Sequence, residues 1–309
     1  NMNLIRNKRI GIALAMVLAL SAASGCSVRE YAARSLGDAL ASGGEVYASD
    51  NDIELVGVAT PFGLKTMESL LAVVPDHRGL LLAATRGFTQ YAYVYVQMPA
   101  EDLEARDVTR AYAERDRARR LFLRARDYGL RGLGLADGNA AQALFRDPSA
   151  ALASTDADDV ALLYWTAVAW AAAISLGKDS PALVAGLPAV DALVARAVAL
   201  DPDFDHGTLQ TFLIGYVVSR PNAAPDAPQR ARAHFERAVA LSDGQQAAPY
   251  VSLAESVAAP ARDRREFNAL LAQALNIDPA ARPQWRLANL VMQRRARWLR
   301  SHANELFPE

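Results

Sequence analysis

The chain has 309 residues, of which 52% are hydrophobic, with one cysteine and a formal net charge of −1. A chain of this length and composition can bury a hydrophobic core that is stable without a bound metal or disulfide bonds. Much of the apolar fraction is alanine, and runs of glycine, proline or β-branched residues are sparse, so the composition predicts an all-α fold. The balanced charge argues against nucleic acid as a partner.

The N-terminal segment has the parts of a bacterial signal peptide. A short basic stretch over residues 3–9 precedes an apolar run over residues 10–20, which is shorter than the ~20 residues of a membrane-spanning helix. Small residues then lead to Cys26 in the string ASGC. This string resembles the lipobox of bacterial lipoproteins, although Ala23 stands where leucine is usual. We expect removal of residues 1–25 and lipidation of Cys26.

Lipidation would use the one thiol of the chain, which leaves none for a disulfide, a redox pair or a metal site. The lipid would tether the domain of residues 26–309 to a membrane surface on the periplasmic side. Ser27, rather than aspartate, follows the cysteine. By resemblance to other lipoproteins, this residue favours delivery to the outer membrane.

The region over residues 28–150 is predicted to hold divergent helix pairs. A helical pattern over residues 31–41 ends at a glycine turn. The stretch Ser49-Asp50-Asn51-Asp52 then supplies N-cap chemistry for a helix that turns Ile53 and Val56 inward.

Pro61 is expected to start the next helix, because proline at the first helical position gives up only an amide without a partner. This helix is expected to end at Pro75. Apolar residues at helical spacing then predict a helix over residues 79–97 and another over residues 103–133. The last of these is rich in arginine, and we expect its Arg-rich face to be solvated.

Residues 151–309 contain an internal repeat. The strings RAVALDP, RAVALSD and AQALNIDP align on Ala197, Ala238 and Ala274. A tetratricopeptide unit is a helix pair of about 34 residues that ends in a similar string. The interval from Ala197 to Ala238 is longer than the interval from Ala238 to Ala274, and a polar loop over residues 220–229 explains the difference. The fold class predicted for residues 26–309 is therefore a single domain of tetratricopeptide-like helical repeats, an α-solenoid.

Several strings together resemble the T-component (TatT) family of tripartite ATP-independent periplasmic (TRAP) transporters. They are ELVGVATPFGLKTMESLLAVVPDHRGLLLAATRGFTQYAYVYVQ, RRLFLRARDYGLRGL, LLYWTAVAWAAAISLGKDSPALVAGLPAV and RAVALDPDFDHG. The resemblance covers roughly residues 37–283. It implies an all-helical, tetratricopeptide-like lipoprotein that docks the periplasmic solute-binding subunit of such a transporter. It further implies a homo-oligomer, with a trimer as one form, and a ligand tunnel.

Aromatic side chains are the candidates for contact with a ligand. Their helical spacing fits either a groove for an apolar, carboxylate-bearing ligand or plain core packing, and core packing is the commoner reason for such a stripe. The tyrosine hydroxyls and Gln90 or Gln97 would orient the ligand. The candidate lining residues are Phe88, Tyr91, Tyr95, Gln97, Trp165 and Trp170.

Motifs for catalysis, metal binding or a cofactor are absent from the sequence. The four histidines, His77, His206, His234 and His302, are scattered without the spacing of a zinc motif, and a turn-capping role is expected for His77 and His206. Neither a phosphate loop nor a Gly-x-Ser-x-Gly elbow occurs. The sequence therefore predicts no enzyme activity, no metal and no cofactor.

Three functions remain open at this point. The first is a lipid-tethered scaffold for the solute-binding subunit. The second is an assembly factor for an envelope complex, because many tetratricopeptide lipoproteins have that role. The third is a helical hydrolase, which would need a cluster of carboxylates with perturbed pKa values.

Replacement of the lipidation residue tests the N-terminal interpretation. Because the thiol of Cys26 would carry the lipid, Cys26→Ser should abolish incorporation of labelled palmitate in the native host. Unchanged labelling of the variant would contradict the assignment.

Overall fold

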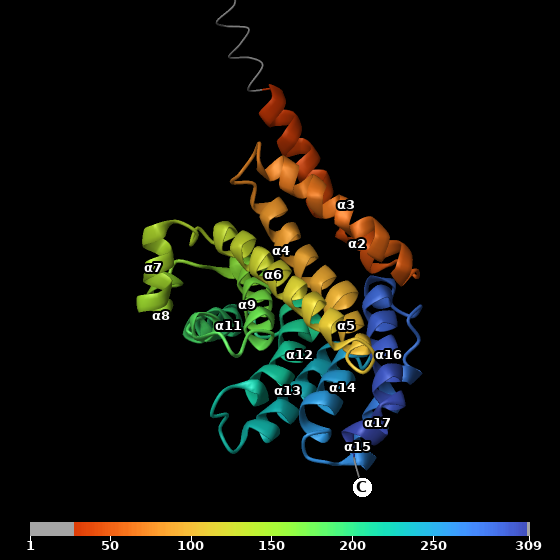
Figure 1. The fold of residues 1–309 in the computed structure, drawn as a ribbon. Coiled ribbons are helices and arrows are strands. Elements are labelled where there is room, and N and C mark those ends of the chain that lie inside the picture. Colours follow the sequence, from red (N-terminus) through yellow and green to blue (C-terminus); the bar gives the residue numbers. More distant parts are fainter. Residues whose placement is uncertain (1–27, 308–309) are drawn as a thin grey trace, which may run out of the picture.

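In the computed structural model, residues 28–307 are described, and every regular element among them is a helix (Figure 1). The predicted all-α class is confirmed. The predicted signal peptide and Cys26 lie outside the described residues.

An N-terminal layer is formed by a helix over residues 28–42, α2 (Gly44–Ala48) and α3 (Ile53–Leu71). α3 begins where Asp52 accepts a hydrogen bond from the amide of Leu55 at 2.9 Å, which confirms the predicted cap. The prediction that Pro61 starts a separate helix is wrong, because α3 runs through this residue. Residues before and after Pro61 share one buried face, and their common burial offsets the ~3 kcal/mol cost of an interior proline. The buried residues of α3 are Ile53, Val56, Leu64 and Leu71.

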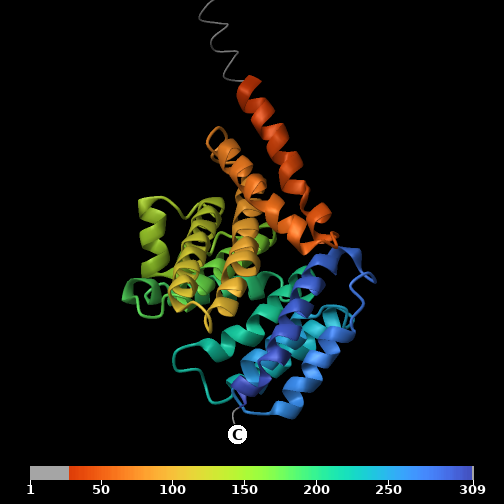
Figure 2. The ribbon, with the colours of Figure 1, turned by 45° about the vertical axis from the view of Figure 1, so that its right-hand side comes forward.

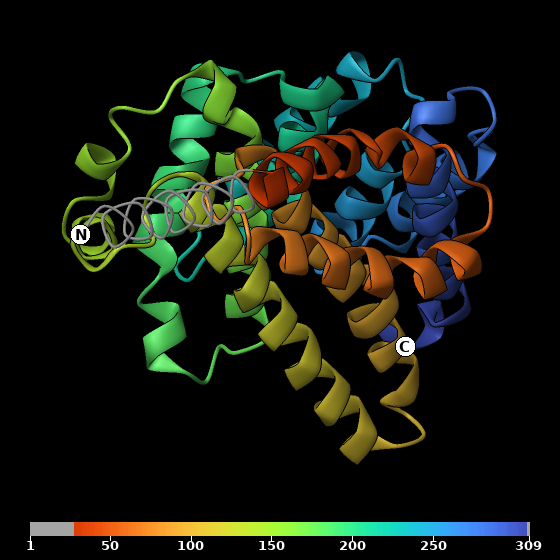
Figure 3. The same cartoon turned by 90° about the horizontal axis from the view of Figure 1, so that it is seen from above.

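The next helix is longer than predicted. α4 (Arg78–Ala92) continues without a break into η1 (Tyr93–Gln97), which is a π-helical turn, and then into α5 (Met98–Leu103). The expected end at Gln97 is therefore wrong by two turns. α5 and the first turns of α6 (Val108–Gly132) project together from the body of the molecule (Figure 3).

α6 packs between α4 and α9 (Val160–Ser175). Gly129 on α6 allows the close approach to α9, because a Cβ atom there would lie 2.0 Å from the buried hydroxyl of Thr166. Three short elements join the two helices. They are α7 (Gly138–Arg146), α8 (Pro148–Ala151) and the 3-10 turn η2 (Ala157–Asp159).

The C-terminal half continues as a series of packed helices. α9 packs on α11, α12 on α13, and α14 with its π-helical extension η3 packs on α15. The bounds are α10 (Pro181–Val184), α11 (Leu187–Leu200), α12 (Phe204–Ser219), α13 (Ala227–Leu241), α14 (Ala248–Leu253), η3 (Ala254–Ala258), α15 (Arg264–Asn276), η4 (Pro283–Trp285), α16 (Arg286–Ser301) and α17 (Ala303–Leu306).

The last long helix, α16, returns to the N-terminal layer and contacts α2 and α3 as well as α14 and α15 (Figures 1 and 2). Arg286 donates a hydrogen bond to the carbonyl of Ser49 at 3.2 Å, and Arg294 forms an ion pair with Glu54. The two ends of the described chain are thereby joined. This contact places α16 beside η1 and α5, where the groove described below is formed.

Two stretches, Ala157–Ser175 and Pro181–Leu200, have the length and apolar composition of a membrane span. Both contribute side chains to the largest hydrophobic cluster of the described residues, including Trp170, Val190 and Leu193. Their apolar character is accounted for by the protein core.

The close approach of α6 and α9 predicts the effect of a single added methyl group. Gly129→Ala should lower the free energy of unfolding by about 2 kcal/mol, because the buried Thr166 must move to admit the new Cβ atom. Urea denaturation measures this loss. Gly138→Ala is the matched control, because no atom lies within 4 Å of a Cβ built there, and it should change stability by less than ~0.5 kcal/mol. Equal stabilities of the two variants would contradict the tight α6–α9 contact.

Candidate functional site

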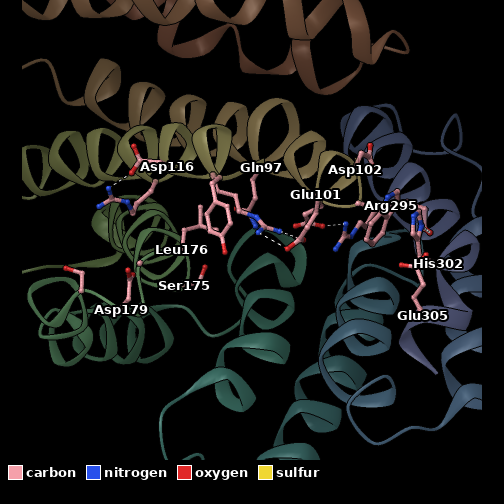
Figure 4. Close-up of a pocket in the computed structure, with 18 residues that line it drawn as sticks. Gln97, Glu101, Asp102, Asp116, Ser175, Leu176, Asp179, Arg295, His302 and Glu305 are labelled. Carbon is pink, nitrogen blue, oxygen red and sulfur yellow. Dashed lines mark hydrogen bonds and ion pairs between the residues drawn. The ribbon is translucent and has the colours of Figure 1, made fainter. Parts of the chain in front are cut away.

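A surface groove of about 1150 Å³ lies between α16 and the projecting segment that α5 and the first turns of α6 form (Figure 4). Glu101 of α5 and Arg115 of α6 line one wall, and Arg295 of α16 and His302, which directly follows α16, line another. The C-terminal end of α9, at Ser175, closes the side that faces the start of α10. Segments from the first half of the described chain and from its C-terminal end therefore build this groove.

Arg295 lies at the junction of these walls, and only 11% of its side chain is exposed. One of its terminal nitrogens forms an ion pair with Glu101, and the other contacts the carboxylate of Glu255 at 2.6 Å. The Nε atom donates a second hydrogen bond to Glu255 at 3.0 Å. Such a paired guanidinium satisfies its donors in a fixed geometry, so Arg295 ties α5 and η3 to α16.

Two π-helical turns supply residues to this ion cluster. Tyr93 belongs to η1 and Glu255 to η3. In each turn a backbone amide bonds to a carbonyl five residues earlier, from Met98 to Tyr93 and from Ala259 to Ala254.

A proline follows each of these amides, Pro99 after Met98 and Pro260 after Ala259. The proline ring would collide with the carbonyl four residues before it in a regular α-helix. A widened turn relieves this collision. π-helical turns within α-helices occur frequently at functional sites.

The environment of the ion cluster shifts the pKa values of its members. Burial opposes the charge of Arg295, but Glu255 and Glu101 outweigh it and raise the pKa of Arg295 above its usual range. Burial also raises the pKa of the Glu255 carboxyl, against the attraction of Arg295. Burial, followed by the charge of Glu255, raises the pKa of Tyr93. The cluster is a structural ion pair in a low-dielectric position, and the attraction of Arg295 is what offsets the burial of two carboxylates.

An aromatic pair extends the cluster into the groove. The guanidinium carbon of Arg295 lies 4.4 Å from the centroid of the Trp298 ring, which is a cation–π contact. The His302 ring stacks on Trp298 with a centroid distance of 4.3 Å. The indole nitrogen of Trp298 is buried and has no hydrogen-bond partner among the described residues. These contacts fix the position of Trp298 in the groove wall.

Carboxylates outnumber cations in the lining of the groove. Six acidic side chains face three arginines, and Arg295 is already bound by Glu101 and by Glu255. The groove therefore carries an excess of negative charge and suits a basic surface. The six acidic residues are Glu101, Asp102, Glu104, Asp116, Asp179 and Glu305.

The structure does not bring the six predicted ligand-lining residues together. Gln97 lines the groove, and Trp170 lines a second, smaller hollow on another part of the surface. The others lie in packed clusters. Phe88 is buried and stacks on Tyr128 at 5.9 Å, and half-buried Trp165 packs edge-on against Tyr164.

Tyr91 and Tyr95 lie next to each other on the same helix, with ring centroids 5.6 Å apart. The Tyr95 hydroxyl donates a hydrogen bond to the carbonyl of Ile53 at 2.9 Å, which ties η1 to the start of α3. Burial raises the pKa of Tyr95 to about 12. Contact of these tyrosines with a ligand stays a prediction.

The predicted capping role is confirmed for His77. Its Nδ1 atom accepts a hydrogen bond from the amide of Leu80 at 3.2 Å at the start of α4. His206 lies in a left-handed turn with φ of 53° and packs against Trp285, without a capping hydrogen bond. Within residues 28–307, no group of three or more potential ligands is arranged to hold a metal ion.

The sequence interpretation missed the Arg295 cluster. The prolines at 99 and 260, each within an apolar helical pattern, are the available signal for the two π-helical turns. The ion pairs themselves join residues 194 and 40 positions apart, and neither local spacing nor composition reveals contacts at that range.

The helical body and its groove define an all-helical protein with a charged surface groove. The family model of the TRAP transporter T-component matches residues 49–307. The chain belongs to this family, as its sequence strings indicated. An uncharacterized protein of Treponema pallidum (strain Nichols) is 28% identical over an alignment of 302 residues, which covers 92% of this chain and 94% of that protein.

The ion cluster predicts a large loss of stability on removal of its cation. Arg295→Met should lower the free energy of unfolding by about 3 kcal/mol, because Glu101 and Glu255 would stay partly buried without a counter-charge. Chemical denaturation measures this change. The triple variant with Glu101→Gln and Glu255→Gln should recover most of the loss.

Arg294→Met is the matched control, because Arg294 directly precedes Arg295 on α16. Arg294 is half exposed and pairs with an exposed glutamate, so its loss should cost less than ~1 kcal/mol. An equal loss of unfolding free energy for Arg294→Met and Arg295→Met would contradict the claim that the buried cluster stabilises the fold more than an exposed ion pair does.

Proposed function

We propose that this chain is the lipid-anchored T-component of a TRAP transporter and that it holds the periplasmic solute-binding subunit near the membrane. The observation that carries the proposal is membership of the T-component family over residues 49–307, which is nearly the whole described chain. This family is a component of transporters and not a family of enzymes. The function is thus binding, without the making or breaking of bonds.

The helical architecture suits a scaffold. Three successive helix pairs, α9 with α11, α12 with α13 and α14–η3 with α15, pack in chain order. Ala197, Ala238 and Ala274, on which the sequence repeats align, are buried in the second helix of each pair. Equivalent burial at equivalent repeat positions supports a tetratricopeptide-like, solenoid arrangement, and such arrangements present extended surfaces to partners.

The groove is the surface that we assign to the solute-binding subunit. It is built from the first half of the described chain and from its C-terminal end, and it carries excess negative charge. Exposed groups such as Asp102 and Glu305 lie on its rim without an ion-pair partner among residues 28–307. A basic patch on the subunit would complement this charge and accelerate encounter.

The anchor completes the proposed mechanism. Lipidation at Cys26, in the periplasm and with the outer membrane favoured, would confine the scaffold to a surface. Tethering raises the effective concentration of a partner without any new contact. Assembly as a homo-oligomer, with a trimer as one form, and a hydrophobic ligand are the further properties that the family resemblance implies.

Co-purification tests this function. A tagged chain isolated from the native periplasm under conditions that preserve weak complexes should recover the solute-binding subunit. Asp102→Lys with Glu305→Lys should reduce that recovery at least about fivefold, because reversal of two charges repels a basic partner. Higher salt should weaken the wild-type complex in the same direction.

Glu236→Lys is the matched control, because Glu236 is exposed on α13 and lies outside the groove. It should leave recovery unchanged. Recovery of envelope-assembly proteins in place of the solute-binding subunit would contradict the transporter function and support the assembly-factor alternative. Equal recovery with all variants would contradict the assignment of the groove.

A further inference from the structure

A second hollow of about 740 Å³ lies where α6 passes α7 and α9. Its apolar side chains come from three segments and include Leu130, Leu135, Phe145 and Trp170. Trp170 is buried, whereas Phe145 is 56% exposed and packs edge-on against it at 5.8 Å between ring centroids. A large aromatic side chain is therefore left half-covered at the edge of an apolar depression, which is the kind of surface that a small ligand covers.

Arginines from α6 surround this apolar floor. The guanidinium of Arg126 lies 5.2 Å from the centroid of the Trp170 ring, so the arginine stacks on the floor of the hollow. Arg131 lies 5.7 Å from the Tyr128 ring and donates to the carbonyl of Pro75 at 2.7 Å. The Arg-rich face of α6 is expected to be solvated, and the contacts of Arg126 and Arg131 are exposed. Both arginines line a hollow together with aromatic rings.

The rim keeps a positive charge after its ion pairs are counted. Arg120 shares Asp116 with Arg119, Arg124 shares Glu68 with Lys65, and Arg126 pairs with Asp127. Of the charged side chains that line the hollow itself, four are arginines, Arg120, Arg124, Arg126 and Arg131, and one is a carboxylate, Asp127. Among the described residues, Arg131 has a carbonyl partner but no carboxylate within ion-pair distance.

We propose that this hollow binds an anion with an apolar body, namely a monocarboxylate that carries an alkyl chain or an aromatic ring. The apolar body covers Phe145 and Trp170, and the carboxylate accepts hydrogen bonds from the terminal nitrogens of Arg131, whose Nε and one terminal nitrogen also donate to the carbonyl of Pro75. The opposite charges of the two hollows separate their roles. The groove beside α16 attracts a basic surface, and the hollow beside α7 attracts an anion.

Arginine is suited to this position because its weakly hydrated, planar guanidinium stacks on aromatic rings and still offers donors to a carboxylate. The same side chains would give little affinity for a small anion without an apolar body, because exposed ion pairs contribute little by themselves. The proposal does not depend on docking of the solute-binding subunit, so either can fail without the other.

Titration calorimetry with four probes tests the proposal on the purified chain. Octanoate, octanol, octylammonium and acetate separate the contribution of the alkyl chain from that of the head group. Octanoate should bind at least about fivefold more tightly than octanol, which corresponds to ~1 kcal/mol for the charge, and octylammonium and acetate should bind most weakly. Equal binding of the three eight-carbon probes, or no binding of octanoate, would overturn the proposal.

Variants locate the site. Arg131→Gln should remove the preference for octanoate over octanol, and Phe145→Ala should weaken both probes because Phe145 contacts the chain rather than the head. Arg124→Gln provides a second test of the rim on a side chain that is 49% exposed.

Arg110→Gln is the matched control, with the same change on an exposed arginine of α6 outside the hollow. Circular dichroism melting confirms that each variant is folded. If Arg110→Gln and Arg131→Gln reduce octanoate binding equally, the effect is one of net charge and the site does not exist.

Discussion

The buried ion cluster around Arg295 is the interaction on which the contact between the two halves of the described chain depends. Arg295 on α16 holds Glu101 from the N-terminal half and Glu255 from the C-terminal half at the same point. Hydrophobic contact supports this junction, because Ile53, Met98 and Val291 form a small cluster beside it. A guanidinium bound by two carboxylates adds directional contacts to this packing and fixes one register of α16 against its neighbours.

The two π-helical turns explain how the junction is reached. Each widened turn precedes a proline and brings one residue, Tyr93 or Glu255, to the ion cluster. Each π-helical turn therefore occurs where a side chain of the ion cluster must leave the regular α-helical register. The groove and the junction share their residues, so a partner that docks in the groove contacts the same helices that hold the fold together.

Sequence reasoning predicted the helical class and several helix starts, because these depend on local signals. Asp52 and His77 cap helices as their positions indicated, and the family was recognisable from uncommon strings. The sequence prediction was wrong at Pro61, because the burial of residues before and after Pro61 outweighs the local preference of proline to begin a helix.

The sites were less predictable than the helices. Aromatic spacing in α4 and η1 identifies a buried face, but it does not tell whether that face meets the core or a ligand, and Phe88 meets the core. Arg295 and the arginines of α6 gain their roles from residues distant in sequence, which no single-chain pattern encodes. Charge distribution over a surface becomes visible only when the helices are assembled.

Site-specific photo-crosslinking in the native periplasm tests the central claim most directly, namely that the solute-binding subunit docks in the groove beside Arg295. A photoreactive residue at position 112 replaces Tyr112, which is 67% exposed in the groove, and one at position 55 replaces Leu55, which is 58% exposed on α3. The account predicts a cross-link to the solute-binding subunit from position 112 and none from position 55. A cross-link from position 55 alone would contradict it.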